Sequence, residues 1–449
     1  MRFSIITFSK TLISCIGLLY SINIANAESF PPPDQPVPIS DQLIELVDHH
    51  PLTLSAMERL KAAQAKSKYR GYYYPDPELS FMYMDAPYKK DPARLSKKNF
   101  PETELEINQP IPTPGRLSVE SAMFDIEAEQ ARLAFRAEAN KLSASYLNTL
   151  VEIEKAMHHY ELTKKYRIKF APILSISGAQ YALGKSDLSD VSIARLSSRD
   201  LEIKEKQYQK IKESEEQNLA YYNDRNSSKD LPSFDQLQNY ADQLLIRLKS
   251  ETRPITDVSI ELGIAALNTK LQEKQSTINK LVYVPDFSIF AKYNQIKRQS
   301  PNPLDETTWF MPKPDNRLSL GFTMRVPLWS ALNNHNNVEE SSRLQAAAKY
   351  DYQDLSRSAE VARSSLLIQI ESAKERLSLI RSRMIPEANR AVIAAREGYQ
   401  SGKSDFGALL QVWDSLYSLE MEAIEIEAEQ LQKTFELARL LNQILPTNQ

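Results

Sequence analysis

Few residues of this chain have the types and spacing that site chemistry requires, and the clearest set is a polar phrase that occurs twice. The phrase Tyr-x-x-Gly-Lys-Ser-Asp-apolar stands at residues 181–188 and again, 218 positions later, at 399–406. Five identities at matched spacing indicate an internal duplication. Glycine after a helical run supplies the left-handed residue that ends a helix, and Ser-Asp just beyond it can cap the next helix. Each copy is therefore predicted to be the tip of a helical hairpin.

Catalytic chemistry has no comparable signal in the sequence. There is no Gly-rich phosphate loop and no nucleophile motif, and the five histidines form no metal pattern. Two adjacent pairs, His49-His50 and His158-His159, are interpreted as exposed helix-surface residues. With 55 basic and 58 acidic residues, the charge is nearly balanced and no nucleic-acid partner is indicated. We expect no enzyme, no cofactor and no metal site.

The N-terminus is typical of a secretory signal. Arg2 and Lys10 precede an apolar stretch, and Ala25-Asn26-Ala27 ends it, so residues 1–27 are predicted to be removed after Ala27. An alternative interpretation takes Cys15 as the acylated cysteine of a lipoprotein box. If the first interpretation holds, the mature chain has no cysteine, and its stability cannot depend on disulfides.

Hydrophobic periodicity places these tips between unusually long helices. Only 10 glycines in 449 residues also argue for long helices with few turns. In the first half the pattern predicts a helix from Ser40 to Gly71, strands near 79–84 and 104–108, a helix over 116–183 and a return helix to Asn223.

The second half repeats this order. The pattern predicts a helix from Pro254 to about Lys280, a strand after Pro285, a loop, and a strand over 318–326, followed by a long helix and a return helix. In the last strand Leu320 and Phe322 share one face, while Ser319 and Thr323 share the other. The long helix has a narrow apolar seam that is expected to run from Ala348 through Ile370, Ala373, Leu377, Ile380 and Met384 to Tyr399, and the return helix continues it from Leu409 to Ile426.

These elements divide the chain into two structural repeats. The predicted organisation is a signal peptide at 1–27, a first repeat at 28–224 with its tip at 181–190, an equatorial or linker segment at 225–256, and a second repeat at 257–449 with its tip at 399–408. The fold class is mostly α, internally duplicated, with long coiled-coil helices and four membrane strands per chain. Because four strands leave open edges, a strand-embedded chain of this kind has to oligomerise, and three copies would give twelve strands.

The order and the motifs together resemble the TolC family of outer-membrane efflux proteins. The resemblance covers essentially the whole mature chain, and it is carried by the duplicated tips, the Pro-led strands after Tyr74-Pro75 and Val284-Pro285, and the strand exits at Pro110 and Pro327. It implies a homotrimer with one 12-stranded β-barrel in outer-membrane lipid and a helical tunnel across the periplasm. It also implies two partners, a periplasmic adaptor protein and an inner-membrane pump.

The resemblance also assigns roles to residues of the tips. Gly184, Lys185, Gly402 and Lys403 are implied to contact the adaptor, and Asp190 and Tyr399 to form an entrance gate. The gate pattern is incomplete, because Ser404 stands where the family archetype has an arginine. Ala408 and Gln411 replace its two pore-constricting aspartates.

Two questions stay open at this stage. Besides an efflux channel, the helical hairpins fit a periplasmic coiled-coil adaptor or a structural envelope protein, although neither explains the duplicated amphipathic strand pairs. The transported substrate is the other question. The stretch Glu106-Ile107-Asn108-Gln109-Pro110, with Gly115-Arg116, is similar to the heavy-metal branch of the family.

Overall fold

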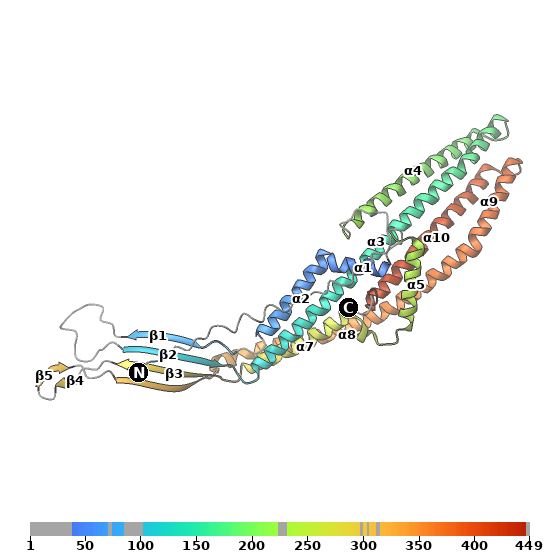
Figure 1. The fold of residues 1–449 in the computed structure, drawn as a ribbon. Coiled ribbons are helices and arrows are strands. Elements are labelled where there is room, and N and C mark those ends of the chain that lie inside the picture. Colours follow the sequence, from blue (N-terminus) through green and yellow to red (C-terminus); the bar gives the residue numbers. More distant parts are fainter. Residues whose placement is uncertain are drawn as a thin grey trace, which may run out of the picture.

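The computed structural model describes residues 38–445 except 71–73, 85–101, 223–230, 297–299, 303–304 and 311–314. The predicted signal peptide at 1–27, with its cleavage after Ala27 and the alternative at Cys15, lies outside these residues. The molecule is elongated, with a β-sheet at one end and two long helical hairpins at the other (Figure 1).

The first half follows the order that the sequence predicts. It contains α1 (Ile39–His49), α2 (Pro51–Arg70), β1 (Glu78–Met84), β2 (Glu102–Ile111), α3 (Arg116–Ala182) and α4 (Leu188–Leu219). At 67 residues α3 is about 100 Å long, at a rise of about 1.5 Å per residue. The predicted helix over 116–183 is thus confirmed, and it continues through Pro172.

The second half repeats this order with more interruptions. It contains α5 (Phe234–Ser250), α6 (Ile255–Val258), α7 (Ile260–Leu281), β3 (Asp286–Ile296), β4 (Ser300–Asn302), β5 (Asp305–Phe310), β6 (Asp315–Arg325), α8 (Leu328–Leu379), the π-helix η2 (Ile380–Met384), α9 (Ile385–Gln400) and α10 (Phe406–Leu440).

Three details differ from the sequence prediction. The single helix expected from Ser40 to Gly71 is two helices, because His50 adopts an extended backbone between α1 and α2. The single helix expected after Pro254 is two helices, because Ser259 adopts an extended backbone between α6 and α7, and the predicted boundary between residues 256 and 257 falls inside α6. In addition, the loop expected between the last two strands contains a small hairpin of β4 and β5.

The π-helix changes the apolar seam of the long helix. A π turn holds one more residue than an α turn. The buried positions therefore step from Ile380 by five residues to the partly buried Ile385, and then continue through Ala388 to Tyr399. Met384, which an uninterrupted period would bury, is 48% exposed. The expectation for Met384 was wrong because a sequence period does not reveal an inserted residue.

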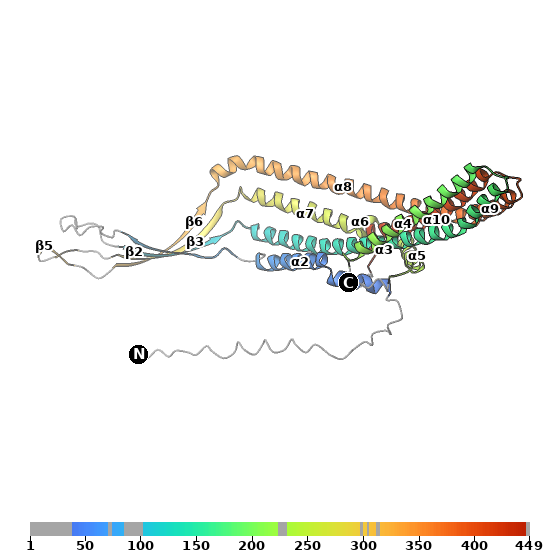
Figure 2. The ribbon, with the colours of Figure 1, turned by 90° about the horizontal axis from the view of Figure 1, so that it is seen from above.

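The strands form one four-stranded antiparallel sheet in the order β1-β2-β3-β6. Next to one end of the sheet, α2, α3, α7 and α8 run side by side, as Figure 2 shows, and neighbours in this order pack against one another. Farther from the sheet α3 packs against α4, α10 packs against both α3 and α9, and the pairs α3/α4 and α9/α10 form the hairpins. Among the described helices, none is both long enough and apolar enough to cross a membrane.

The main core lies where the two repeats meet, around α5. Leu43 of α1, Leu147 of α3, Leu237 of α5, Leu262 of α7 and Phe435 of α10 are all fully buried in it. A capping box of Ser233 and Gln236 begins α5. Burying each such side chain stabilises the fold by about 1.5 to 3 kcal/mol, so α5 is a packed part of the core.

Candidate functional site

One face of the sheet is apolar and solvent-exposed in the single chain. Its exposed members come from all four strands: Leu79, Phe81, Tyr83, Leu105, Ile107, Ile289, Tyr293, Leu318, Leu320, Phe322 and Met324. Leu320 is 76% exposed and Phe322 is 61% exposed. The strand register brings these residues together, since Ala291 pairs with Leu320 and Ile289 with Phe322. A continuous apolar surface of this kind indicates contact with lipid or with protein.

The opposite face is polar. At its centre the Nζ atom of Lys292 lies 2.5 Å from Oε1 of Glu104 and 3.2 Å from Oε2 of Glu106. Glu104 is buried beneath this contact. A sheet with one apolar face and one polar face suits strands that have lipid on one side and water on the other.

A cavity lies on the polar face where the sheet joins α3. Its volume is about 460 Å³, and its lining includes Glu78, Asn108, Arg116, Glu120, Asp286 and Arg325. Arg116 is paired with Glu120 at 2.9 Å. The Asn108 Oδ1 atom is buried and has no hydrogen-bond partner among the described residues. Sequence periodicity gave no signal for this cavity, because its walls come from four strands and a helix.

Both hairpin tips have the same backbone turn. Gly184 has a φ of 69° and Gly402 a φ of 72°, in the left-handed region that favours glycine. The Lys185 N–H donates to the Gln180 carbonyl at 2.9 Å, and the Lys403 N–H donates to the Gly398 carbonyl at 2.9 Å. The N–H groups of both glycines bond to carbonyls three residues earlier. This pattern is a Schellman motif in each copy. The prediction that each glycine supplies the left-handed residue that ends its helix is confirmed.

The two tips lie side by side within one chain. The Gln180 side chain in the last turns of α3 donates to the Gln400 carbonyl at 3.3 Å. Burial and the carboxylates of Asp187 and Asp405 raise the pKa of Asp190. The carboxylates of the two hairpins are therefore close enough to repel one another electrostatically.

Tyr399 belongs to the same cluster. Its side chain is 5% exposed, and its ring packs edge-on against Phe406 with centroids 5.5 Å apart. The hydroxyls of Tyr399 and Ser186 are both buried without a hydrogen bond of normal geometry among the described residues. Burial raises the pKa of Tyr399, the nearby Ser186 hydroxyl opposes this rise, and the Asp190 charge adds to it. Tyr399 and Asp190 are thus near each other, and no hydrogen bond joins them within the chain.

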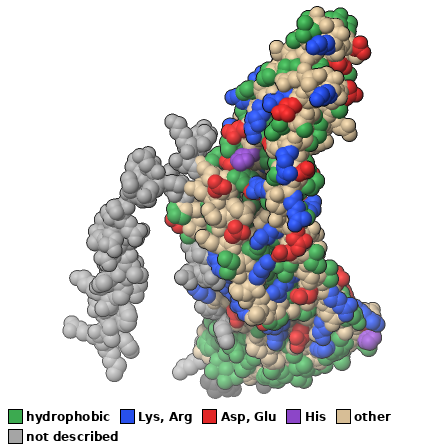
Figure 3. All heavy atoms as spheres, turned by 90° about the vertical axis from the view of Figure 1, so that its right-hand side faces the viewer, with side chains coloured by type: hydrophobic (Ala, Val, Ile, Leu, Met, Phe, Trp, Pro, Cys, Tyr) green, Lys and Arg blue, Asp and Glu red, His purple; other side chains and the backbone are tan. Residues whose placement is uncertain are grey.

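The lysines of the two tips are available to a partner. The side chains of Lys185 and Lys403 are exposed, and neither makes an ion pair within the described part of the chain. Figure 3 shows acidic and basic side chains mixed along the helical part of the molecule, with hydrophobic side chains gathered towards the end nearer the sheet.

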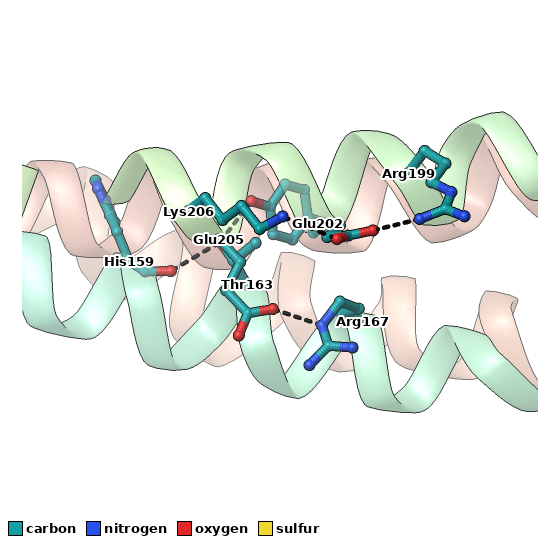
Figure 4. Close-up of polar contacts among 8 residues, drawn as sticks. His159, Thr163, Arg167, Arg199, Glu202, Glu205 and Lys206 are labelled. Atoms are coloured by element: carbon teal, nitrogen blue, oxygen red, sulfur yellow. Dashed lines mark hydrogen bonds and ion pairs between the residues drawn. The ribbon is translucent and has the colours of Figure 1, made fainter. Parts of the chain in front are cut away.

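Charged contacts hold the helices of the first hairpin together. The Arg167 Nε of α3 lies 2.5 Å from the Glu205 carboxylate of α4 (Figure 4). On α4 itself Glu202 accepts from Arg199 at 2.8 Å and from Lys206 at 3.0 Å, and the hydrogen bonds from Lys206 and Arg199 lower the pKa of Glu202. Exposed pairs of this kind contribute little to stability, because water and salt screen the two charges.

The histidine pairs differ from their predicted role. His49 is exposed, but His50 is buried: its Nδ1 accepts from the Leu52 N–H, which leaves its Nε2 to donate to the Tyr221 carbonyl at 3.2 Å. His159 is also buried, against Tyr208, and burial lowers its pKa. The prediction of exposed histidines was wrong for His50 and His159. His50 lies in the extended junction between α1 and α2, where it contacts Tyr221, and His159 lies on a face of α3 that packs inward.

Comparison with known proteins agrees with this geometry. Residues 260–443 match the family model described as outer membrane efflux protein. No curated protein matches the sequence. The family match covers the second repeat, from the start of α7 to just beyond the end of α10.

Solved structures match nearly the whole chain in fold. The outer-membrane protein VceC from Vibrio cholerae has a TM-score of 0.71 at 15% identity, over 90% of this chain and 96% of that one. CusC, described in the context of transmembrane channel formation, has a TM-score of 0.71 at 14% identity, over 90% of this chain and 91% of that one. The outer-membrane channel CmeC from Campylobacter jejuni has a TM-score of 0.69 at 12% identity, over 91% of this chain and 87% of that one.

The fold is therefore that of outer-membrane channel proteins. The family match in the second repeat and the fold of the whole chain confirm the predicted resemblance to the TolC-like outer membrane efflux proteins.

Proposed function

We propose that this chain is one protomer of the outer-membrane channel of a tripartite efflux system. It conducts substrates from a periplasmic adaptor and an inner-membrane pump to the exterior. The family match and the fold support this function. The sheet lies in the outer membrane, and the helical tunnel extends into the periplasm.

The observation that carries the proposal is the sheet with two opposite faces and two open edges. The outer edges of β1 and β6 pair with no other strand among the described residues. Unpaired backbone groups are costly in lipid, so the edges must meet those of other copies. Three protomers, each giving four strands, close a 12-stranded barrel with the apolar face outwards and the polar face lining the lumen.

The hairpin tips form the periplasmic entrance and the adaptor contact. Lys185 and Lys403 project from rigid left-handed turns, so their charges are available to acidic groups of the adaptor. Gly184 and Gly402 set the shape of the surface that the adaptor meets.

Asp190 and Tyr399 act as a weak gate. They lie close to each other in opposite hairpins, without a hydrogen bond within one chain, and Ser404, Ala408 and Gln411 supply no charge to strengthen the closed state. Opening moves the α9/α10 tip away from the α3/α4 tip. A modest interaction suits an entrance that opens when an adaptor docks.

The substrate class remains a choice between two groups. The similarity around Glu106–Pro110 keeps metal ions as candidates, beside drugs and other small molecules. The adaptor and envelope-filament alternatives are not favoured, because either would leave the exposed apolar face of the sheet in water.

A pair of arginine substitutions tests the channel assignment. Leu320→Arg places a charge on the lipid side at a cost of about 2 to 4 kcal/mol per chain, and the trimer carries it three times. Ser319→Arg places the same charge on the polar face. We expect the first to reduce heat-modifiable trimer in the outer-membrane fraction and the second to assemble. Equal assembly of both variants, or recovery of the unmodified protein as a soluble monomer, would reject the proposed architecture.

A further inference from the structure

A glycine on the polar face of the sheet is overlaid by an aromatic ring. Gly321 of β6 pairs directly with Phe290 of β3. A Cβ atom built on Gly321 would lie 2.1 Å from Cζ of Phe290 and 2.5 Å from Cε1. These distances are far shorter than a contact between two non-bonded carbon atoms, so the ring occupies the space that a side chain at 321 would need. The Phe290 ring therefore lies over the backbone of Gly321.

Phe290 is unusual for its face. It lies on the same face of the sheet as Lys292. In the neighbouring strand β2 it pairs with Asn108, which is on that face too. Among the described residues of β1, β2, β3 and β6 on the polar face, Phe290 is the aromatic one. An aromatic ring that projected from this face would enter the water-filled space. A ring lying over a glycine instead stays against the wall.

We propose that Gly321 is a pore-shaping residue, which receives the Phe290 ring and keeps it out of the channel lumen. This inference rests on the proposed function, in which the polar face of three copies lines one barrel. Any side chain at position 321 would displace three rings towards the barrel axis and narrow it. An aromatic ring over a strand glycine can also stabilise a sheet. A role in stability alone predicts no change in the width of the pore, whereas a pore-shaping role predicts a narrower pore when position 321 carries a side chain.

The test is a double-mutant cycle measured in planar bilayers. Gly321→Ala, Phe290→Ala and the double variant are compared with the unmodified trimer for single-channel conductance and for the largest neutral polymer that enters from the barrel side. Ser319→Thr, which adds one carbon atom elsewhere on the same face, is the matched control. Trimer yield in the outer-membrane fraction is measured for every variant.

We expect Gly321→Ala to lower the polymer size limit and the conductance, and the double variant to restore both. We expect Phe290→Ala alone to change the size limit little, because the ring already lies against the wall. An unchanged size limit in Gly321→Ala would overturn the inference, as would a reduction that persists in the double variant.

Phe290→Ala also decides the question if Gly321→Ala does not assemble. A clear increase of the size limit in this variant would show that the ring projects into the lumen, and would overturn the inference. Failure of the proposed function is distinguishable, because the unmodified protein would then form no channels at all.

Discussion

The two hairpin tips are copies of one turn with different polar chemistry. Their backbones agree, since Gly184 and Gly402 have nearly equal φ angles and the same pair of closing hydrogen bonds. Their side chains do not. Asp405 caps α10 by accepting from the Ala408 N–H at 2.8 Å, whereas Asp187 begins α4 without a side-chain capping bond.

The residue three positions after the cap differs as well. Asp190 in the first tip corresponds to Ala408 in the second, 218 residues later. At this position the first tip therefore carries a carboxylate, whose pKa is raised by burial and by its acidic neighbours, and the second tip carries a methyl group. The comparison shows that both copies keep the residues that the turn geometry requires, while the charged residues that follow the turn have diverged between the two hairpins.

The largest expected effect tests the shared backbone. Proline at 184 or at 402 requires a φ near −65°, which the left-handed turn excludes, and it removes the hydrogen bond from the glycine N–H to the carbonyl three residues earlier. We expect Gly184→Pro and Gly402→Pro each to abolish export while the trimer still assembles in the membrane. Export is measured in cells that also produce the adaptor and the pump.

Gly178→Ala is the control for this prediction, since Gly178 lies in α3 with open space around it and without a positive φ. Normal export by one of the two proline variants would break the equivalence of the tips.

A smaller effect tests the difference in capping. Removing a side-chain cap costs typically about 1 kcal/mol of local stability. We therefore expect Asp405→Ala to speed hydrogen exchange at the first amides of α10, and Asp187→Ala to leave the first amides of α4 nearly unchanged. Equal acceleration at both tips would show that Asp187 caps its helix in solution.

The smallest effect concerns pH. The pKa of Asp190 is raised in the folded state above its ordinary value of 3.8, so the folded tip holds its proton at pH values where the unfolded chain has lost it. Protonated Asp190 therefore stabilises the folded tip at low pH, and this stabilisation is lost as pH rises from 3.8 through the raised pKa. We expect Asp190→Asn to remove this pH dependence from hydrogen exchange at the tip.

Ala408→Asp provides the mirror experiment, because it gives the second tip the carboxylate that it lacks. A pH dependence that survives in Asp190→Asn would assign the titration to Asp187 or Asp405.

Features of the fold and of the candidate site that depend on neighbouring residues in the sequence could be predicted, and features that depend on contacts between distant segments could not. Helix α3 and both tips were predictable, because the spacing of apolar residues indicates a helix and a glycine indicates where it ends, both within a few residues of sequence. The π-helix at Ile380–Met384, which packs against α8, α9 and α10, was not, since a sequence period does not reveal an inserted residue. The contact of Phe290 with Gly321 depends on strand register, and the burial of His159 depends on which face of α3 meets α4 and α10.

The central claim is that the chain forms a channel whose entrance lies at the two tips. Cysteines at Gln180 and Gln400, which lie in contact across the tips, can be joined by a cleavable thiol crosslinker. The measurement is single-channel conductance of the purified trimer before and after cleavage of the link. We predict a low conductance while the tips are joined and a higher one once they are released. A conductance that is the same in both states, or the absence of any channel, would contradict the account.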